Sequence, residues 1–167
     1  FRVYLATLIV PSQAILIPLF TIIQKLHLMN TYLVLALPVV NAFGVFLVRQ
    51  FMTGLPDELI EAARIDGCRE FKIYYAIILP LMKPVLVALT VFTFITTWND
   101  FVWPLVAITD GNKSTLTLAL ASLQGNYATN YGLVMAGAAL VFLPPFILYI
   151  FLQKQFVEGI ALSGVKG

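Results

Sequence analysis

The charged residues that could take part in recognition or catalysis gather in one stretch of this sequence, between long apolar runs. This stretch carries the acids Asp57, Glu58, Glu61, Asp66 and Glu70, and the bases Arg64, Arg69 and Lys72. Even with Arg49 counted among the bases, the five acids outnumber the four cations. A polar segment in an otherwise apolar chain favours a docking element outside the membrane, and it is the segment most informative about function.

The rest of the sequence offers little for catalysis. His27 and Cys68 are the only histidine and cysteine, which excludes an intrachain disulfide and a histidine-rich metal site. No nucleophile–base set and no paired carboxylates lie inside an apolar run. A glycine-rich phosphate loop ending in Gly-Lys-Ser/Thr is also missing, so we expect no ATP binding by this chain, no cofactor and no metal. We therefore expect that this chain is not an enzyme.

Composition points to a membrane protein. The 167 residues are 60% hydrophobic and 11% charged, with a mean hydropathy of +0.94, whereas soluble domains have about 25% charged residues. A net charge of +2 is too small to indicate nucleic acid. At this length we expect one membrane domain over residues 1–167. Because the chain begins with Phe1 and turns apolar at once, we expect the piece to be truncated at its N-terminus.

Four apolar runs reach the roughly 20 residues that a spanning helix needs. They are Val3–Ile23, Tyr32–Phe51, a run from about Pro84 or nearer Ile77 to Trp98, and Tyr131–Leu152. The alternation of a membrane β-strand is absent from them, so the predicted fold is all-α and polytopic with about four transmembrane helices. Their internal prolines favour kinks and helix packing over broken helices that line a pathway.

The distribution of lysine and arginine predicts the orientation, because short cytoplasmic loops are enriched in both. Four spans place most of the cations on one face: Arg2, Arg49, Arg64, Arg69, Lys72, Lys83, Lys154 and Lys166. Lys25 and Lys113 alone fall on the other face. Both ends of the piece are then cytoplasmic, and the loops Gln24–Thr31 and Asn99–Asn130 are external.

Residues 52–80 then form a cytoplasmic loop with its own helices. Pro56 suits the first helical position, and Gly67 suits the left-handed position after a helix end, which predicts a helix of about 11 residues. A second short helix is predicted over Arg69–Tyr75. A helix lying on the lipid surface is the alternative, but anionic headgroups would repel an acidic face. A protein partner is therefore favoured.

The loop also resembles a known family. Glu61-Ala62-Ala63, three residues, Gly67, nine residues and Ile77-x-Leu79-Pro80 match every fixed position of the signature loop in permease subunits of bacterial ABC importers. The segments Asn41–Phe51, Trp98–Leu105 and Gly164–Gly167 are similar to those of the carbohydrate-uptake type, as in maltose and glycerol-3-phosphate permeases. The resemblance covers nearly the whole chain. Such permeases usually have six spans, so about two are expected to be missing here.

The resemblance implies a sugar transporter of the bacterial cytoplasmic (inner) membrane. Its loop would be the coupling helix, which sits in a cleft of a separate cytoplasmic ATPase subunit. Glu61 would be the charged contact, Ala62 and Ala63 the close-packing face, and Gly67 the turn that lets the loop seat. The implied coupling set is completed by Asp66, Leu79 and Pro80. The implied partners are ABC ATPase subunits, a second permease, an extracytoplasmic solute-binding protein, a sugar substrate and the lipid bilayer, with no nucleic acid.

Several alternatives remain open from the sequence. A secondary transporter or channel should place ionisable groups inside its spans, and these spans have essentially none. An ABC permease for another solute class is a second alternative, and the piece need not function alone. In the predicted external segment, Trp98, Trp103, Tyr127 and Tyr131 are expected to be interface anchors, although the segment could meet a binding protein. Asp100 is expected to be a hydrogen-bonding group and not a sugar ligand.

Overall fold

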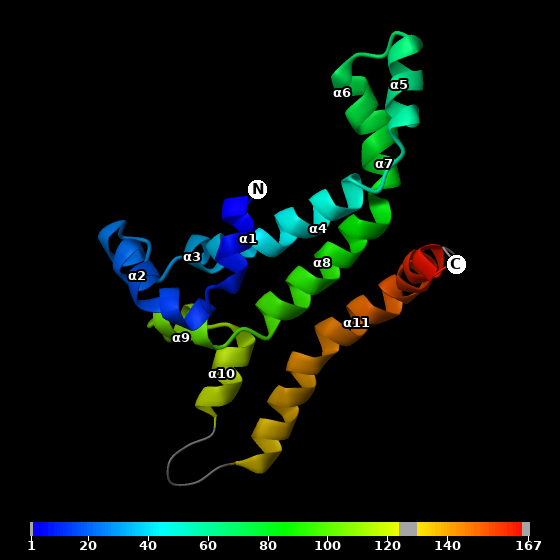
Figure 1. The fold of residues 1–167 in the computed structure, drawn as a ribbon. Helices are drawn as coiled ribbons and strands as arrows, with labels where there is room; N and C mark the ends of the chain where they lie inside the picture. The colour runs from blue at the N-terminus through cyan, green and yellow to red at the C-terminus, as the bar shows by residue number, and fades with distance from the viewer. Residues whose placement is uncertain (1, 124–129, 165–167) are drawn as a thin grey trace.

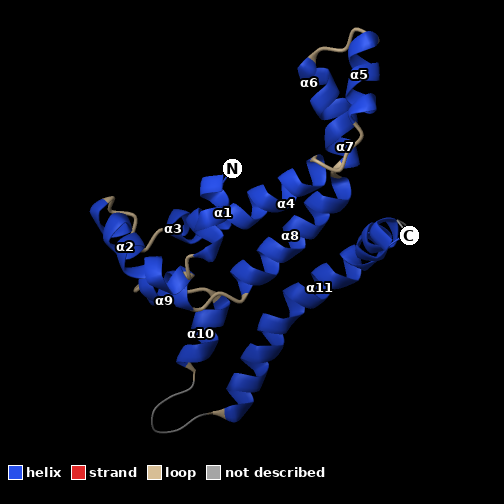
Figure 2. Cartoon of the chain, in the orientation of Figure 1, coloured by secondary structure: helices blue, strands red, loops and turns tan. Residues whose placement is uncertain are grey.

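The computed structural model describes residues 2–123 and 130–164, and every regular element in those ranges is helical (Figures 1 and 2). The first half contains α1 (Arg2–Ile9), α2 (Ser12–Lys25), α3 (Tyr32–Ala36), η1 (Leu37–Val39), α4 (Ala42–Met52) and α5 (Asp57–Ile65). The second half contains α6 (Glu70–Ile73), the π-helical η2 (Tyr74–Ile78), α7 (Leu79–Leu81), α8 (Lys83–Trp98), α9 (Val102–Ala107), η3 (Gly111–Lys113), α10 (Leu116–Ser122) and α11 (Tyr131–Gly164). The all-α prediction is confirmed.

The number of continuous membrane helices is lower than expected. Within the described residues, Tyr32–Met52 and Tyr131–Gln153 are long and apolar enough to cross a bilayer, and a bent pair makes a third candidate. The expected first span is wrong, because the chain breaks at Pro11 into helices of 8 and 14 residues. Proline has no N–H to donate and moves the preceding residue out of the α region.

The third candidate span is bent by 67° between Glu70–Leu81 and Lys83–Trp98. Pro80 cannot donate a hydrogen bond to the preceding turn, and the π-helical η2 lies directly before it. The straight part of this span begins at Lys83 and not near Ile77. The predicted short helix Arg69–Tyr75 instead begins at Glu70 and continues without a break to Leu81.

α8 is the central helix, with α4 and α11 packed against it (Figure 1). The rings of Phe43 and Phe92 lie 5.5 Å apart between α4 and α8. A Cβ at Gly44 would stand 3.4 Å from Leu89 Cδ1, so glycine permits this close approach. On the other side, Trp98 Nε1 donates to the carbonyl oxygen of Val141 over 3.0 Å, which joins α8 to α11.

A separate apolar cluster holds α2, α3 and α9 together at the end of α8 where Trp98 lies. Its buried members are Ile23, Val34, Trp103, Ala107 and Ile108. Trp103 Nε1 donates to the carbonyl oxygen of Val34 over 2.9 Å. The prediction of an interface anchor is therefore wrong for Trp103, which is a buried core residue. Tyr131 is exposed as expected, and Tyr127 lies outside the described residues.

Asn30 joins the two loops that were expected to share one side of the membrane. Its side-chain oxygen accepts from the backbone N–H of Thr109 over 2.7 Å and of Asp110 over 2.9 Å. Lys113 Nζ donates to the Asn30 carbonyl oxygen over 2.9 Å. The two loops therefore lie together. Asp100 is a hydrogen-bonding group as predicted, because its Oδ1 accepts from the backbone N–H of Trp103.

Candidate docking hairpin

α5 and α6 form a helical hairpin that projects from the bundle, and we call residues 57–73 the docking hairpin (Figure 1). α5 runs away from α4 and α8, the chain turns between Asp66 and Arg69, and α6 leads back through α7 to α8. The hairpin carries the acids and bases of the polar stretch. The lobe of α2, α9 and α10 lies at the opposite end of α8.

The start of α5 differs slightly from the prediction. Pro56 is the residue before the helix, with φ −63° and ψ 129°, and not its first helical residue. Asp57 and Glu58 lie in the first turn, where their negative charge suits the positive end of the helix dipole. The helix has 9 residues instead of about 11, because it begins one residue later and ends at Ile65.

Gly67 ends α5 in the predicted left-handed conformation, with φ +74°. Its N–H donates to the Arg64 carbonyl, and the N–H of Cys68 donates to the Ala63 carbonyl, each over 3.0 Å. These two bonds make a Schellman motif, which satisfies carbonyls that the helix end would leave unpaired. The predicted left-handed position of Gly67 after the helix end is therefore confirmed.

The two alanines of the motif occupy different positions. Ala63 is 5% exposed and Ile73 is 1% exposed, and they form the interior of the hairpin. Ala62 and Glu61 are exposed. Ala63 therefore lies inside the hairpin and presents little surface to a partner. Ala62 is the alanine available to a docking protein.

Arg64 and Glu70 join the two helices of the hairpin across the tip. Arg64 Nε donates to Glu70 Oε1 over 2.9 Å, and Nη2 donates to Oε2 over 3.3 Å. This hydrogen bond, with the charge of the guanidinium, lowers the pKa of Glu70. The same interaction raises the pKa of Arg64. Both groups are solvent-exposed, so the pair orients the tip more than it stabilises the fold.

This ion pair gives a prediction for pH. Since the pKa of Glu70 is lowered in the folded state, its contribution is fully present above the unfolded value of about 4.3. The contribution disappears as the pH falls through the lowered folded pKa. Glu70→Gln should therefore lower the melting temperature of the purified complete protein slightly at pH 7, and this difference from the wild type should shrink as the pH falls below about 4.3. A difference that stays constant from pH 7 into the acid range would contradict the ion-pair explanation.

Two apolar side chains at the tip complete a surface that the sequence pattern did not single out. Ile65 is 86% exposed and Phe71 is 83% exposed. Ile65 follows Glu61 by four residues, so both lie on one face of α5. This four-residue spacing is the sequence signal that could have identified the surface. Large apolar side chains this exposed beside acids fit a protein partner better than solvent.

The second half of the signature lies apart from the tip. Leu79 and Pro80 belong to α7, at the base of the hairpin, where the 67° bend leads into α8. Glu61, Ala62, Asp66 and Gly67 lie on α5 and in the turn at its tip. The structure therefore divides the predicted set into a tip that can meet a partner and a base that joins the tip to the membrane helix.

The surface of the hairpin has the composition of a protein-binding surface. Among the residues that the structure describes, no group of three or more His, Cys, Asp or Glu side chains could hold a metal ion. Cys68, beside the turn, is half-buried. An exposed helix face with acids, a small residue and apolar side chains can dock a complementary protein surface.

Comparison with characterised proteins agrees with this geometry. The chain is 42% identical to the arabinooligosaccharides transport system permease protein AraQ of Halalkalibacterium halodurans, covering 100% of the chain and 60% of that protein. It is 38% identical to the lactose transport system permease protein LacG of Rhizobium radiobacter, covering 99% of the chain and 61% of that protein. It is 40% identical to the sn-glycerol-3-phosphate transport system permease protein UgpE of Pectobacterium atrosepticum, covering 94% of the chain and 57% of that protein.

A solved structure shares the fold as well. It is the crystal structure of a bacterial ABC transporter that imports the acidic polysaccharide alginate, with a TM-score of 0.69 and 27% identity over 84% of this chain and 55% of that chain. The chain thus spans roughly three fifths of the curated relatives' length. The family model for the binding-protein-dependent transport system inner membrane component matches residues 1–161, and this multi-pass membrane chain belongs to that family.

Proposed function

We propose that this chain is the membrane-spanning part of a permease subunit through which an ATP-driven importer moves a sugar into the cell. ATP hydrolysis takes place on a separate ATPase subunit, which receives the docking hairpin. A second, non-identical permease completes the pathway, and an extracytoplasmic binding protein delivers the solute. The protein resides in the cytoplasmic membrane, with the docking hairpin on its cytoplasmic side.

The projecting hairpin is the observation that supports this proposal. Its tip exposes Glu61, Ala62 and Ile65 on one helix, while Ala63 and the turn at Gly67 keep the two helices together. α6 continues into α7 and then, across the bend, into α8. A movement of the tip can therefore be passed to a membrane helix through a short, nearly continuous helical arm.

A lipid-surface role for the hairpin is less well supported. Ile65 and Phe71 could enter a bilayer surface, but Glu61 and Asp66 lie beside them on α5 and its turn. Anionic headgroups repel such a face. A secondary transporter is also disfavoured, because such proteins place ionisable groups inside their membrane spans. The two continuous candidate spans, Tyr32–Met52 and Tyr131–Gln153, contain one charged side chain, Arg49, and it lies near the end of its span.

A crosslinking experiment tests the hairpin's partner. Cys68 is half-buried, so the more exposed Ile65→Cys should be labelled with a short photo-crosslinker in a Cys68→Ser background. The complete protein is expressed with its neighbouring subunits in membranes, and captured peptides are identified by mass spectrometry. We expect capture of an ATPase-subunit peptide, with a yield that changes when ATP is added.

The exposed Tyr131, at the start of α11, provides the control position. Tyr131→Cys carries the same crosslinker and should capture no ATPase peptide, because it lies at the end of the molecule away from the hairpin (Figure 1). Capture of lipid alone at position 65 would favour the surface-helix interpretation. Equal capture of the ATPase at both positions would show that the reaction is not specific to the hairpin.

A further inference from the structure

α8 carries a row of threonines, and some of their hydroxyls make no hydrogen bond to a carbonyl of the same helix. Thr90, Thr93 and Thr97 recur at the spacing that places side chains on one helix face. The Thr90 hydroxyl donates to the Leu86 carbonyl over 2.8 Å, as is usual for threonine in membrane helices. Among the described residues, no partner is recorded for the hydroxyls of Thr93 and Thr97. They are therefore free to bind something else.

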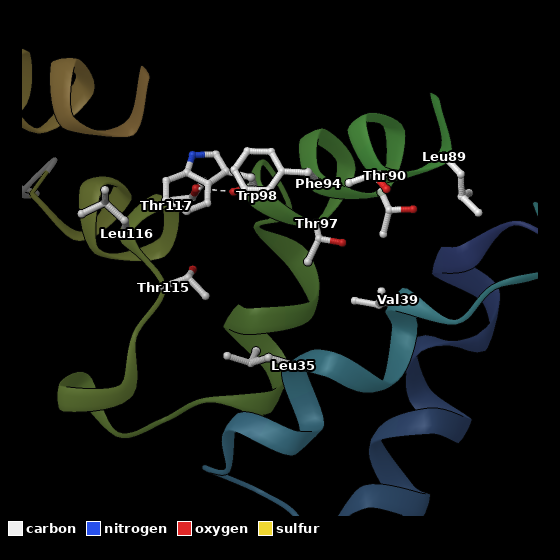
Figure 3. Close-up of a pocket in the computed structure, with 11 residues that line it drawn as sticks. Leu35, Val39, Leu89, Thr90, Phe94, Thr97, Trp98, Thr115, Leu116 and Thr117 are labelled. Carbon is white, nitrogen blue, oxygen red and sulfur yellow. Dashed lines mark hydrogen bonds between the residues drawn. The ribbon is translucent and has the colours of Figure 1, made fainter. Parts of the chain in front are cut away.

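This threonine face borders an open cavity of about 680 Å³ (Figure 3). The opposite walls come from Leu35 of α3, Val39 of η1, and Thr115 and Leu116 at the start of α10. Leu35 and Val39 belong to the candidate span Tyr32–Met52, and the threonines belong to the bent third candidate. The cavity thus lies between two membrane segments, and its volume is within the range of small-molecule sites.

An aromatic wall stands next to the threonines. Phe94 and Trp98 are stacked with their ring centroids 5.5 Å apart. The Trp98 indole is fixed by its hydrogen bond to the Val141 carbonyl, and the Trp98 carbonyl accepts from the Thr117 hydroxyl over 2.7 Å. Fixed aromatic walls with a few convergent hydroxyls are the lining that small-molecule pockets commonly have.

The chemistry of the lining restricts the ligand. None of the eleven described residues that line the cavity is charged. An anion such as a sugar phosphate or a uronate would lose its hydration here without a countercharge, which is costly. Hydroxyl groups of a neutral solute can instead exchange their water hydrogen bonds for those of Thr93 and Thr97.

We infer that the threonine face of α8 lines the solute route in this subunit and binds a neutral, hydroxyl-rich solute through the hydroxyls of Thr93 and Thr97. This inference rests on the proposed transport function. It adds that the transported saccharide is uncharged. Thr96 is the matched control within the same helix. Its hydroxyl donates to the Phe92 carbonyl over 2.8 Å, and it does not line the cavity.

Transport by the complete importer in proteoliposomes tests the inference. ATP is enclosed on the ATPase side, and initial uptake of labelled lactose, an arabinose trisaccharide and sn-glycerol 3-phosphate is measured per assembled complex. We expect the wild type to transport one of the neutral saccharides. Thr97→Val should lower that rate about threefold to tenfold, as expected for one lost hydrogen bond, and Thr93→Val/Thr97→Val should lower it further. Thr96→Val should stay within about twofold.

The outcomes separate this inference from the proposed function. Saccharide uptake that is equally fast in Thr97→Val and Thr96→Val would overturn the threonine site while leaving the sugar importer intact. Preferred uptake of sn-glycerol 3-phosphate by the wild type would overturn the neutral-solute assignment. If the assembled wild type hydrolyses ATP and moves none of the three solutes, the proposed sugar transport itself fails.

A labelling measurement gives a second readout that does not depend on rate. Thr97→Cys and Thr96→Cys are made in a Cys68→Ser background and exposed to a charged, water-soluble thiol reagent. Thr97→Cys should react faster, and the transported saccharide should slow its reaction. Equal reactivity at both positions, or no protection at position 97, would show that this cavity is filled by another helix and not by the solute.

Discussion

Uptake is expected to fall at least about tenfold when Gly67 is replaced with valine in the complete transporter. Gly67 has φ +74°, a conformation that costs a non-glycine residue roughly 1–2 kcal/mol and a β-branched residue more. The substitution would displace Cys68 and loosen the bonds that end α5. If the hairpin docks on the ATPase as we propose, a misplaced tip should seat poorly there, and ATP hydrolysis and uptake should become uncoupled. Uptake assays on assembled complexes measure this effect.

Two control variants separate the possible causes at Gly67. Apart from its two chain neighbours, none of the residues that the structure describes lies within 4 Å of a Cβ at this position, so steric exclusion here would have to come from a partner. Asparagine adopts the left-handed conformation more readily than valine does, so Gly67→Asn should strain the turn less than Gly67→Val. If Gly67→Asn keeps uptake near the wild-type rate, the turn geometry is what matters. If Gly67→Asn and Gly67→Ala fail as completely as Gly67→Val, a partner surface touches the backbone here. Normal uptake in Gly67→Val with normal assembly would contradict the coupling role.

Replacing Trp103 with alanine is expected to have the largest effect on stability. Trp103 is buried in the cluster with Ile23, Val34 and Ala107, and its indole N–H is bonded to the Val34 carbonyl. Truncation of a buried tryptophan costs about 3–5 kcal/mol. The link between α9 and α3 would be lost with it. We therefore expect a large fall in the melting temperature of the purified complete protein in detergent.

Milder variants divide the Trp103 effect into packing and hydrogen bonding. Trp103→Phe keeps an aromatic ring but leaves the Val34 carbonyl without its donor, so it should cost about 1–3 kcal/mol. Tyr131→Ala, at an exposed position, should change stability by less than about 0.5 kcal/mol. A melting temperature in Trp103→Ala as high as that of Tyr131→Ala would contradict the buried-core assignment.

The local features of the hairpin were predictable because each depends on near neighbours in the chain. Acids in the first turn of α5, the helix break at Gly67 and a second helix beyond it follow from residue type and position. The opposite roles of Ala62 and Ala63 were not predictable, since both alanines follow Glu61 directly. Only the packing of α6 against α5 buries Ala63 beside Ile73 and leaves Ala62 exposed.

One feature was missed because a hydropathy sum ignores local breaks: the run Val3–Ile23 was counted as one span, although Pro11 breaks the helix into α1 and α2. Other features needed the tertiary structure. Trp103 appeared in the sequence as an interface aromatic, but its hydrogen-bond partner Val34 is 69 residues away. Likewise, the contacts of Asn30 with Thr109 and Asp110 join loops that are about 80 residues apart.

The sequence by itself determined that the chain is helical, lies in a membrane and carries one polar loop between its apolar runs. Composition, apolar run length and turn residues act locally, so they can be recognised without the fold. The tertiary structure alone decided which hydroxyls of α8 remain free, because Thr93 and Thr97 differ from Thr96 only in what surrounds them. It also set the angle at which the hairpin joins the membrane helix, since Pro80 removes a hydrogen bond and permits a bend there without fixing its 67°.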